Sequence, residues 1–348
     1  MAEPHPVDLR SDTVTRPTPA MREAMLAAPV GDDVYDEDPT VHELERRTAA
    51  LLGHEAGLYC ATGSLTNVLG VRSLVEPGQE VLCDAEAHIA RAEMGAHAAV
   101  SGLTMRTWPS EGGVTTVAQV ERLLSPAAGP YLVSTGAIAL ENTHNFAGGT
   151  VQPLEHLQEL SALAAAAGVG RHLDGARLWN AHVATGVPLE TYGRLFDTVS
   201  VCFSKGMGAP VGSVLVGSAE TVRRARVWRK RLGAGWRQAG MLAAACLHAL
   251  DSHLDDLAAD HAAARAFADA VAERAPGATE PERVQTNIVL LRSTGSAAAV
   301  VAGARERGVL LSAVGPKLVR AVTHRDVSGE DCARAGEVVG ELLTADAA

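Results

Sequence analysis

Two apolar, β-branched segments on either side of a glycine-rich turn constrain the fold more than any other part of the sequence. The segments are Val199–Phe203 and Val211–Val216, and their length and composition predict two buried strands. The turn between them carries one lysine, Lys205. An ammonium group held there is costly unless it is paired or used chemically, because desolvation favours the neutral amine, a nucleophile toward carbonyl groups. Lys205 is therefore either a Schiff-base lysine or a strand-end lysine whose ammonium group reaches solvent.

A carboxylate is predicted close to this lysine. His172-Leu173-Asp174 follows an alanine-rich helix predicted over Leu154–Ala167 and has the character of a buried strand. Asp174 would then lie at the carboxyl end of a strand, where open α/β sheets place ligand-binding groups. A lysine and a carboxylate at neighbouring strand ends suit pyridoxal 5'-phosphate (PLP), because the lysine can hold its aldehyde and the carboxylate can keep its ring nitrogen protonated.

Motifs spread over nearly the whole chain make this prediction specific, and together they resemble the low-specificity L-threonine aldolases. The motifs are RSDTVT (Arg10–Thr15), GDDVYDEDPT (Gly31–Thr40), LENTHN (Leu140–Asn145), HLDGAR (His172–Arg177), SKGMGAPVGS (Ser204–Ser213), RQAG (Arg237–Gly240) and RAVTHRDVS (Arg320–Ser328). The resemblance implies an α/β protein of PLP fold type I (aspartate-aminotransferase-like), with a mostly parallel seven-stranded sheet in the large domain and a smaller C-terminal α/β domain. We expect an N-terminal arm over residues 1–16, the large PLP-binding domain over 17–275 and the small domain over 276–348, since Pro276-Gly277 follows the long helical segment Gln238–Arg274.

Composition narrows the choice of partners. The chain has 348 residues, of which 47% are hydrophobic and 20% charged, and a formal net charge of −11. Such a charge argues against a general nucleic-acid or anionic-membrane binder and favours a small-molecule substrate. The five cysteines include no C-x-x-C pair, so we expect no disulfide framework and no metal site of that kind. The first ten residues lack the features of a signal peptide and no apolar run reaches membrane-spanning length, so we expect a cytoplasmic protein.

A phosphate site is predicted where Ala61-Thr62-Gly63-Ser64 opens a helix. Free N–H groups and the positive end of the helix dipole at such a turn suit a phosphate, although most turns of this composition only connect elements. The resemblance implies that Gly63 and Ser64 form the phosphate site and that Ser204 and Arg177 also bind the cofactor.

The resemblance also assigns residues around the substrate. His88 begins a helix predicted over Ala87–Val100, and its ordinary interpretation is a capping or surface histidine. The family pattern implies instead that His88 stacks on the PLP ring and transfers a proton at the substrate β-hydroxyl. Ser11, on an extended arm, and two arginines, Arg177 and Arg320, are implied to hold the substrate carboxylate, the arginines in bidentate fashion. Without the resemblance, both arginines would be read as surface residues.

Two departures from the family pattern concern substrate choice. Tyr131 aligns where many relatives have a second histidine near the substrate hydroxyl; a phenol with a pKa of about 10 would donate or orient a hydrogen bond there rather than act as a base. An alternative is that the alignment slips across Ser125–Pro130, which would leave Tyr131 outside the pocket. Small residues at Ala90 and Ala92, after His88, are expected to leave room for β-aryl substrates such as phenylserine.

A run of cations from Arg223 to Arg237 inverts the local charge of this acidic chain. It is either a solvated helix face or an anion site, and the resemblance implies that Lys230 and Arg237 reach the PLP phosphate of a neighbouring subunit. The expected assembly is a homo-oligomer, a tetramer built as a dimer of dimers. The acidic stretch Gly31–Asp38 has no neighbouring metal-ligand spacing and is interpreted as a solvated loop, so no metal is expected.

These features predict a carbon–carbon lyase. The implied reaction is the PLP-dependent retro-aldol cleavage of L-threonine, L-allo-threonine and related β-hydroxy-α-amino acids to glycine and an aldehyde, with Lys205, His88, Asp174 and Tyr131 as catalytic residues. The nearest alternatives are a β-eliminating lyase, an aminotransferase or an aldolase for α-methyl-β-hydroxy amino acids on the same cofactor. A binding protein without turnover and a cofactor-free Schiff-base aldolase are more distant ones. A dinucleotide enzyme is disfavoured because no G-x-G-x-x-G turn follows a strand.

Overall fold

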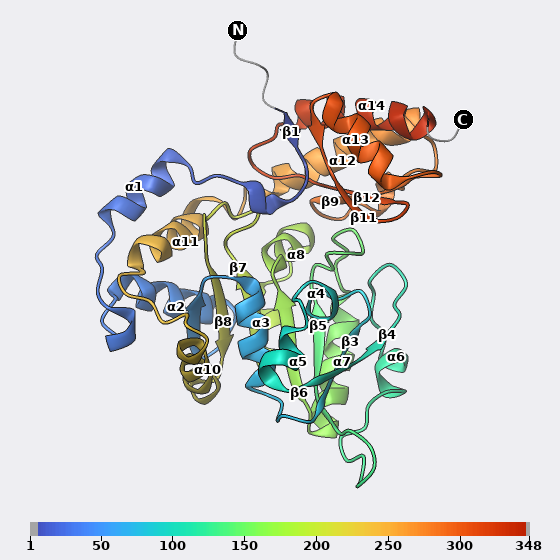
Figure 1. Cartoon of the computed structure of the whole chain (residues 1–348). Helices are drawn as coiled ribbons and strands as arrows, with labels where there is room; N and C mark the ends of the chain where they lie inside the picture. Colours follow the sequence, from blue (N-terminus) through green and yellow to red (C-terminus); the bar gives the residue numbers. More distant parts are fainter. Residues whose placement is uncertain (1–5, 346–348) are drawn as a thin grey trace.

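The computed structural model describes residues 6–345 and is built around a seven-stranded sheet (Figure 1). The strand order is β2-β8-β7-β6-β5-β3-β4, and only β8 runs against the other six strands. This arrangement confirms the predicted mostly parallel seven-stranded sheet. The strands are β2 (Ala56–Cys60), β3 (Glu80–Asp84), β4 (Thr104–Trp108), β5 (Thr135–Glu141), β6 (Gly170–Gly175), β7 (Thr198–Cys202) and β8 (Ser213–Gly217).

Helices cover both faces of this sheet, which is why β3, β7 and β8 are buried along their whole length, whereas the edge strand β4 is largely exposed. On β8, Leu215 packs with α3 and α10, whereas its neighbours Val214 and Val216 belong to the large hydrophobic cluster of the other face. The period of two expected for a strand thus sorts residues between two cores. The helices of this part are α1 (Pro19–Ala27), α2 (Pro39–Leu51), α3 (Gly63–Arg72), α4 (His88–Arg91), α5 (Ala96–Ser101), α6 (Val117–Glu121), α7 (Leu154–Ala167), α8 (Leu178–Thr185), α9 (Leu189–Gly193), α10 (Ala219–Arg231) and α11 (Gly240–Ser252).

The C-terminal part has its own sheet and hydrophobic core. Its antiparallel sheet has the order β11-β12-β9, and α12 packs along α14 beside it. In Figure 1 this part lies above the carboxyl ends of the large sheet. The elements are α12 (Leu257–Arg274), β9 (Ile288–Arg292), α13 (Ala297–Glu306), β10 (Val309–Leu310), β11 (Ser312–Gly315), β12 (Leu318–Val322) and α14 (Gly329–Ala345).

The described part of the N-terminal arm is fixed to this C-terminal core. Strand β1 (Val7–Asp8) pairs with β10, and Leu9 is fully buried in the same cluster as Val319 and Phe267. The next residues form a short 3-10 helix, η1 (Asp12–Val14), that turns back toward the large sheet. The cluster also includes α12, which begins before residue 276, so the domain boundaries given above stay predictions.

Two long helices predicted from the sequence are interrupted in the structure. The segment expected to be helical over 87–100 is divided into α4 and α5, because Met94 and Gly95 adopt positive φ values of 53° and 71°. The segment Gln238–Arg274 is likewise divided into α11 and α12. Alanine-rich composition favours helix but does not indicate where a helix is broken.

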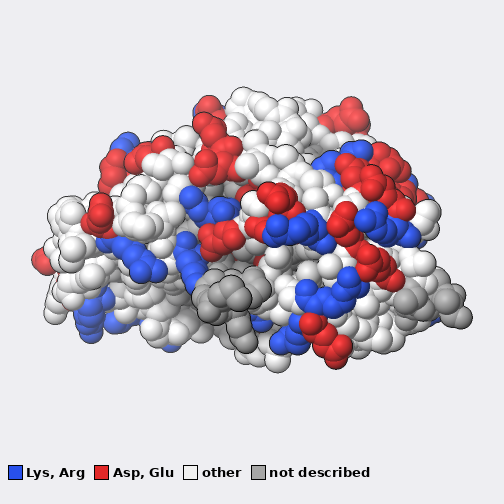
Figure 2. Space-filling model, turned by 90° about the horizontal axis from the view of Figure 1, so that it is seen from above, with Lys and Arg blue, Asp and Glu red and all other residues white. Residues whose placement is uncertain are grey.

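Charged side chains of both signs are mixed on the surface seen in Figure 2, rather than gathered into one large area of a single sign. Between residues 6 and 345, no helix combines the length and apolar character needed to cross a bilayer. All five cysteines are buried free thiols, as is usual for cysteines inside apolar segments.

Candidate active site

Lys205 lies in the loop between β7 and β8, at the carboxyl edge of the sheet. The loop is held at both ends, since Phe203 N–H donates to the Gly212 carbonyl at 2.9 Å and Ala209 N–H donates to the Phe203 carbonyl at 3.0 Å. The Lys205 carbonyl accepts a hydrogen bond from Thr15 Oγ1 at 3.1 Å, which ties the N-terminal arm to this loop. The side chain of Lys205 is thereby presented to the pocket described below.

Asp174 lies near the end of the neighbouring strand β6 and is 3% exposed. Its Oδ1 accepts a hydrogen bond from Ala176 N–H at 3.1 Å, and its Oδ2 accepts one from Asn67 Nδ2 at 2.8 Å. Burial would raise the free energy of an isolated carboxylate, so these donors are what allow Asp174 to remain at the sheet edge. The predicted carboxylate and lysine are therefore brought together.

The amino end of α3 faces the same space. Thr62 caps this helix by accepting a hydrogen bond from Leu65 N–H at 3.2 Å, and Gly63 and Ser64 are the first two helical residues. A Cβ atom added at Gly63 would lie 2.6 Å from Cys202 Sγ, so only glycine fits this close approach. The first N–H groups of a helix have no intrahelical acceptor, which makes this end an anion site.

These three features surround one pocket of about 200 Å³. A buried carboxylate, a lysine amine and a helix amino end are the groups that the ring nitrogen, aldehyde and phosphate of PLP respectively require. The residues present therefore fit the cofactor. The pocket is lined by Thr13, Thr62, Gly63, Ser64, Asn67, His88, Asp174, Ala176, Cys202, Ser204 and Lys205.

His88 is the histidine of this pocket, at the start of α4. Its backbone N–H donates to Glu141 Oε2 at 2.7 Å, and its ring Nδ1 lies 3.0 Å from Glu93 Oε1. Burial alone would lower the pKa of His88, but Glu93 and Asp174 outweigh burial and raise it. A half-buried histidine with a carboxylate on one ring nitrogen is suited to proton transfer through the other nitrogen.

Two arginines meet beside the pocket but have different partners. Arg177 donates from Nε and Nη2 to the two oxygens of Asp12, both at 2.7 Å, so its charge is already neutralised. Arg320 donates from Nη1 to Asn145 Oδ1 at 2.9 Å, and within residues 6–345 its buried Nε has no acceptor. Burial, and then repulsion from Arg177, lower the pKa of Arg320 to about 10. The structure therefore makes Arg320 the arginine that still needs an anion.

Asn145 joins these two arginines, since its Oδ1 also accepts a hydrogen bond from Arg177 Nη1 at 3.1 Å. Ser11 directly precedes Asp12, the partner of Arg177. It caps η1, where its Oγ accepts a hydrogen bond from Thr13 N–H at 3.2 Å. The roles of Ser11 and Arg177 toward a substrate carboxylate stay predictions.

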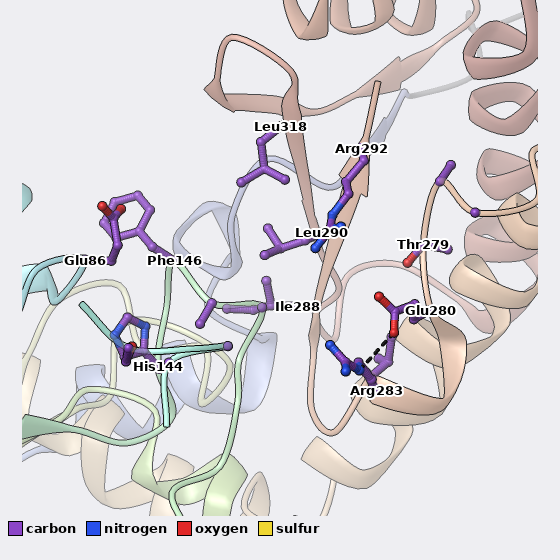
Figure 3. A pocket seen from close by; sticks show the side chains of 18 residues that line it. Glu86, His144, Phe146, Thr279, Glu280, Arg283, Ile288, Leu290, Arg292 and Leu318 are labelled. Carbon is purple, nitrogen blue, oxygen red and sulfur yellow. Dashed lines mark ion pairs between the residues drawn. The ribbon is translucent and has the colours of Figure 1, made fainter. Parts of the chain in front are cut away.

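A second cavity, of about 320 Å³, lies between the large sheet and the C-terminal part. Figure 3 shows Glu86, His144 and Phe146 on one side of it, facing Ile288, Leu290, Arg292 and Leu318 of the C-terminal strands on the other. The cavity adjoins the arginine pair, because Leu290 pairs with Arg320 across β9 and β12 and Phe146 follows Asn145. Its apolar wall is therefore close to the expected substrate position.

The structure does not bring Tyr131 to the site of its own chain. Its side chain is 94% exposed in the loop between α6 and β5. That loop lies at the amino ends of the strands, since Glu80 N–H at the start of β3 donates to the Ser134 carbonyl, whereas Asp174 lies at the carboxyl end of β6. Within one chain, Tyr131 therefore lies away from the pocket, because β5 carries the following motif to the opposite edge of the sheet. Its predicted role at the substrate stays a prediction.

Lys230 and Arg237 are also absent from the lining of the described pocket. Lys230 is exposed in the last turn of α10, and Arg237 is exposed in the connection to α11, where its Nε lies 3.9 Å from Asp32 Oδ2. Both positions are free to meet another molecule, so a role in a neighbouring subunit's site stays a prediction.

Several residues that shape the site were not predicted from the sequence. Asn67 sits at the helical position facing Asp174, Glu93 follows His88 by five residues, and Asp12 pairs with Arg177 across 165 positions of sequence. The spacing of Glu93 after His88 is a local signal that could have been used. The other two pairs depend on long-range folding, which no spacing in the sequence reveals.

Comparison with known proteins agrees with this geometry. A family model described as "Beta-eliminating lyase" matches residues 8–294. The low-specificity L-threonine aldolase 1 of Arabidopsis thaliana is 38% identical over 332 residues, with 93% of each chain covered. The low specificity L-threonine aldolase of Escherichia coli K12 is 39% identical over 329 residues, which cover 94% of this chain and 96% of the relative.

A solved structure of Leishmania major threonine aldolase superposes with a TM-score of 0.84 over 97% of this chain and 100% of its own, at 21% identity. At that identity the likeness supports the fold alone, and it confirms the predicted fold class. The sequence relatives confirm the predicted family and its cofactor. The chain therefore belongs to the beta-eliminating lyase family of PLP-dependent enzymes, and the two relatives described above are low-specificity L-threonine aldolases.

Proposed function

We propose that this protein cleaves L-threonine, L-allo-threonine and related β-hydroxy-α-amino acids, including phenylserine, to glycine and an aldehyde. The observation that carries the proposal is one pocket that joins Lys205, Asp174 and the amino end of α3, with His88 on its wall. The relatives named low-specificity L-threonine aldolases support the same reaction.

PLP, when bound, supplies an aldehyde for the substrate amine and a ring that accepts the electron pair of the breaking Cα–Cβ bond. Lys205 is the amine that would hold its aldehyde, and Asp174 is the carboxylate that would keep its ring nitrogen protonated. The N–H groups at Gly63 and Ser64 would bind its phosphate. Ser204 lines the same pocket.

Arg320 would bind the substrate carboxylate, since its buried Nε is the donor that lacks an acceptor within the described chain. Such a contact fixes which bond at Cα faces the ring, and orientation of this kind supplies much of the rate. His88 would accept the proton of the β-hydroxyl as that oxygen becomes a carbonyl. Arg177 would help mainly by holding Asp12 and Asn145 in place.

The test is product analysis with the PLP-loaded enzyme. We expect equal amounts of glycine and acetaldehyde from L-threonine and L-allo-threonine, and of glycine and benzaldehyde from phenylserine. Release of ammonia with a keto acid would contradict the proposal and favour a β-eliminating lyase. Transfer of the amino group to a keto acid would favour an aminotransferase.

We also propose that the enzyme is a cytoplasmic homotetramer, a dimer of dimers whose active sites are shared between subunits. Exposed apolar side chains support an interface near Arg237: Leu26 is 85% exposed, Tyr35 76% and Met241 47%. Light scattering and cell fractionation test the assembly and the compartment. Mixing inactive Lys205→Ala and Arg237→Ala chains tests sharing, because hybrids should regain partial activity only if one site uses both chains.

A further inference from the structure

Glu93 lies beneath His88 with its side chain fully enclosed. Its Oε1 accepts hydrogen bonds from Asn67 Nδ2 at 2.8 Å and from His88 Nδ1 at 3.0 Å, and its Oε2 accepts one from His97 Nε2 at 2.9 Å. Burial would raise the pKa of Glu93, but His88, His97 and Asn67 together hold it at about 2. Glu93 is therefore a buried anion that uses both oxygens as acceptors.

This anion decides where the proton of the His88 ring resides. An ionised carboxylate only accepts hydrogen bonds, so His88 Nδ1 must carry the hydrogen between the two atoms. In the neutral ring, Nε2 is then the nitrogen with a free lone pair. The second partner, His97, lies on α5 and is 1% exposed, which anchors Glu93 from the side away from the pocket.

Asn67 fixes the same arrangement to the floor of the pocket. Its Nδ2 donates to Glu93 Oε1 and to Asp174 Oδ2, both at 2.8 Å, and its Oδ1 accepts from His172 Nε2 at 3.1 Å. Burial lowers the pKa of His172 to about 4, so His172 stays neutral and keeps one donor for Asn67. The amide can make all three contacts in one orientation only, which joins Glu93 and Asp174 rigidly.

The break between α4 and α5 makes this contact possible. In a continuous helix, position 93 would point in another direction. Instead α4 ends at Arg91 and Met94 takes a positive φ, so the Glu93 side chain can turn back to His88. The interrupted helix that the sequence failed to predict is thus the feature that places this carboxylate.

We propose that Glu93 is a positioning residue that keeps a proton on His88 Nδ1, so that His88 Nε2 takes the proton of the substrate β-hydroxyl. The inference rests on the proposed function. In this step the substrate O–H bond breaks and an Nε2–H bond forms, while the Nδ1 hydrogen stays in place. The resulting imidazolium is stabilised by the Glu93 carboxylate, much as a buried carboxylate stabilises histidine in hydrolase triads.

Other charged groups around His88 limit the size of the expected effect. Asp174 also raises the pKa of His88 and Lys205 lowers it, while Glu141 binds only its backbone N–H. When Glu93 is replaced, His88 still has Asp174 as a carboxylate neighbour. The pKa of His88 should therefore fall only in part. An opposite charge in direct contact shifts a pKa by about 1–3 units, so a fall of about one unit is expected.

The test replaces Glu93 by its amide, Glu93→Gln, in the PLP-loaded enzyme. The pKa of His88 is measured without turnover, by exchange of its ring C2 proton for deuterium in the His88 peptide over a range of pH. The acid limb of the kcat/KM profile for L-threonine is measured in parallel. We expect both midpoints to move down by about one pH unit in Glu93→Gln, and kcat to fall by about 10- to 100-fold.

Two further variants isolate the contact. His97→Gln removes the rear anchor but leaves the bond between Glu93 and His88, so its exchange midpoint should stay within a few tenths of a unit of wild type. His88→Asn should remove the acid limb altogether. Thermal unfolding of each variant reports whether the fold is retained.

Equal midpoints in wild type and Glu93→Gln would overturn the inference, even if activity fell. If Glu93→Gln does not fold, the wild type still decides, because a His88 midpoint at or below the ordinary value of about 6.5 contradicts the inference. Failure of the proposed function is separate: it would show as no glycine from any β-hydroxy amino acid, whereas the exchange midpoint needs no substrate.

Discussion

The floor of the pocket and the region between the large sheet and the C-terminal part differ in how their buried polar groups are paired. On the floor, Asp174, Asn67 and Glu93 use their polar atoms in hydrogen bonds within the chain. Beneath the C-terminal part, within residues 6–345, Arg320 Nε and Asp260 Oδ2 are buried without a partner. A paired network is rigid in advance, as a cofactor site needs, whereas unpaired groups are completed only by a ligand or a movement.

The largest effect is expected from Lys205→Ala, which tests whether the paired groups on the floor of the pocket bind the cofactor without the lysine. Lys205→Ala should abolish cleavage yet still bind PLP reversibly, because Asp174 and the amino end of α3 remain. The chain has three lysines, Lys205, Lys230 and Lys317, so borohydride reduction of the wild type followed by peptide mass analysis gives a clear assignment. A pyridoxyl label on Lys230 or Lys317 would refute the role of Lys205.

The next largest effect is expected at Arg320, whose buried Nε has no acceptor within residues 6–345. Arg320→Ala should lower kcat/KM for L-threonine through a higher KM, because the substrate carboxylate loses a charged donor. A hydrogen bond to a charged group contributes about 1.5–3 kcal/mol, which corresponds to roughly 10- to 150-fold. Arg307→Gln, at an exposed ion pair with Glu341, is the matched control and should leave KM unchanged. An unchanged KM in Arg320→Ala would mean that Arg177 binds the carboxylate despite its pairing with Asp12.

The same division explains what the sequence could predict. Lys205, Asp174 and Arg320 follow or end predicted strands or lie in motifs, and β-sheet topology gathers strand ends at one edge. The apolar segments likewise predicted β7 and β8 to within two residues. Reactive or charged residues that lie at strand ends or in motifs can thus be predicted from a single sequence.

The residues that satisfy such groups are harder to predict, because they come from distant segments. Asp33, expected in a solvated acidic loop, is instead buried in an ion pair with Arg229, 196 positions away. Asp38 caps α2 through Thr40 and Val41 and is fully buried. An acidic cluster has the same composition whether it is solvated or paired, so only the fold distinguishes the two. The position of Tyr131 was not predicted for a related reason, since an alignment position says nothing about which end of the sheet a loop occupies.

Two buried carboxylates, one paired and one unpaired within residues 6–345, should affect the free energy of unfolding in opposite ways as pH changes. Asp12, paired with Arg177, has a pKa of about 2 because that pairing outweighs burial, whereas burial and the nearby Asp12 charge raise the pKa of Asp260 to about 7. A raised pKa means that the folded state binds more protons than the unfolded state between about pH 4 and 7. The free energy of unfolding therefore falls as pH rises through that range, by at most about 4 kcal/mol at 1.36 kcal/mol per unit.

Asp260→Asn removes the loss of stability that ionisation of Asp260 causes. It should therefore stabilise the protein at pH 8 by about 1–3 kcal/mol, with little gain at pH 4. Asp12→Asn should do the reverse: it should destabilise the protein above about pH 4, with the difference shrinking as pH falls toward 2, where the wild-type carboxylate is also protonated. Denaturant unfolding at several pH values measures both. A gain from Asp260→Asn that does not vary with pH would show that the carboxylate is not protonated in the folded state.

The smallest effect is expected at Tyr131, far from both regions. Tyr131→Phe removes a hydroxyl that is exposed at the amino edge of the sheet, so the free energy of unfolding should change by less than about 0.5 kcal/mol. If each chain works alone, kcat/KM for threonine and for phenylserine should also stay the same. Ala90→Tyr is the contrasting variant, because Ala90 is half-buried two residues after His88, and added bulk there should lower the phenylserine-to-threonine ratio. A loss of activity in Tyr131→Phe comparable to that in His88→Asn would contradict the expectation for one chain. Recovery of that activity in hybrids with Lys205→Ala chains would then place the phenol in the site of a second copy.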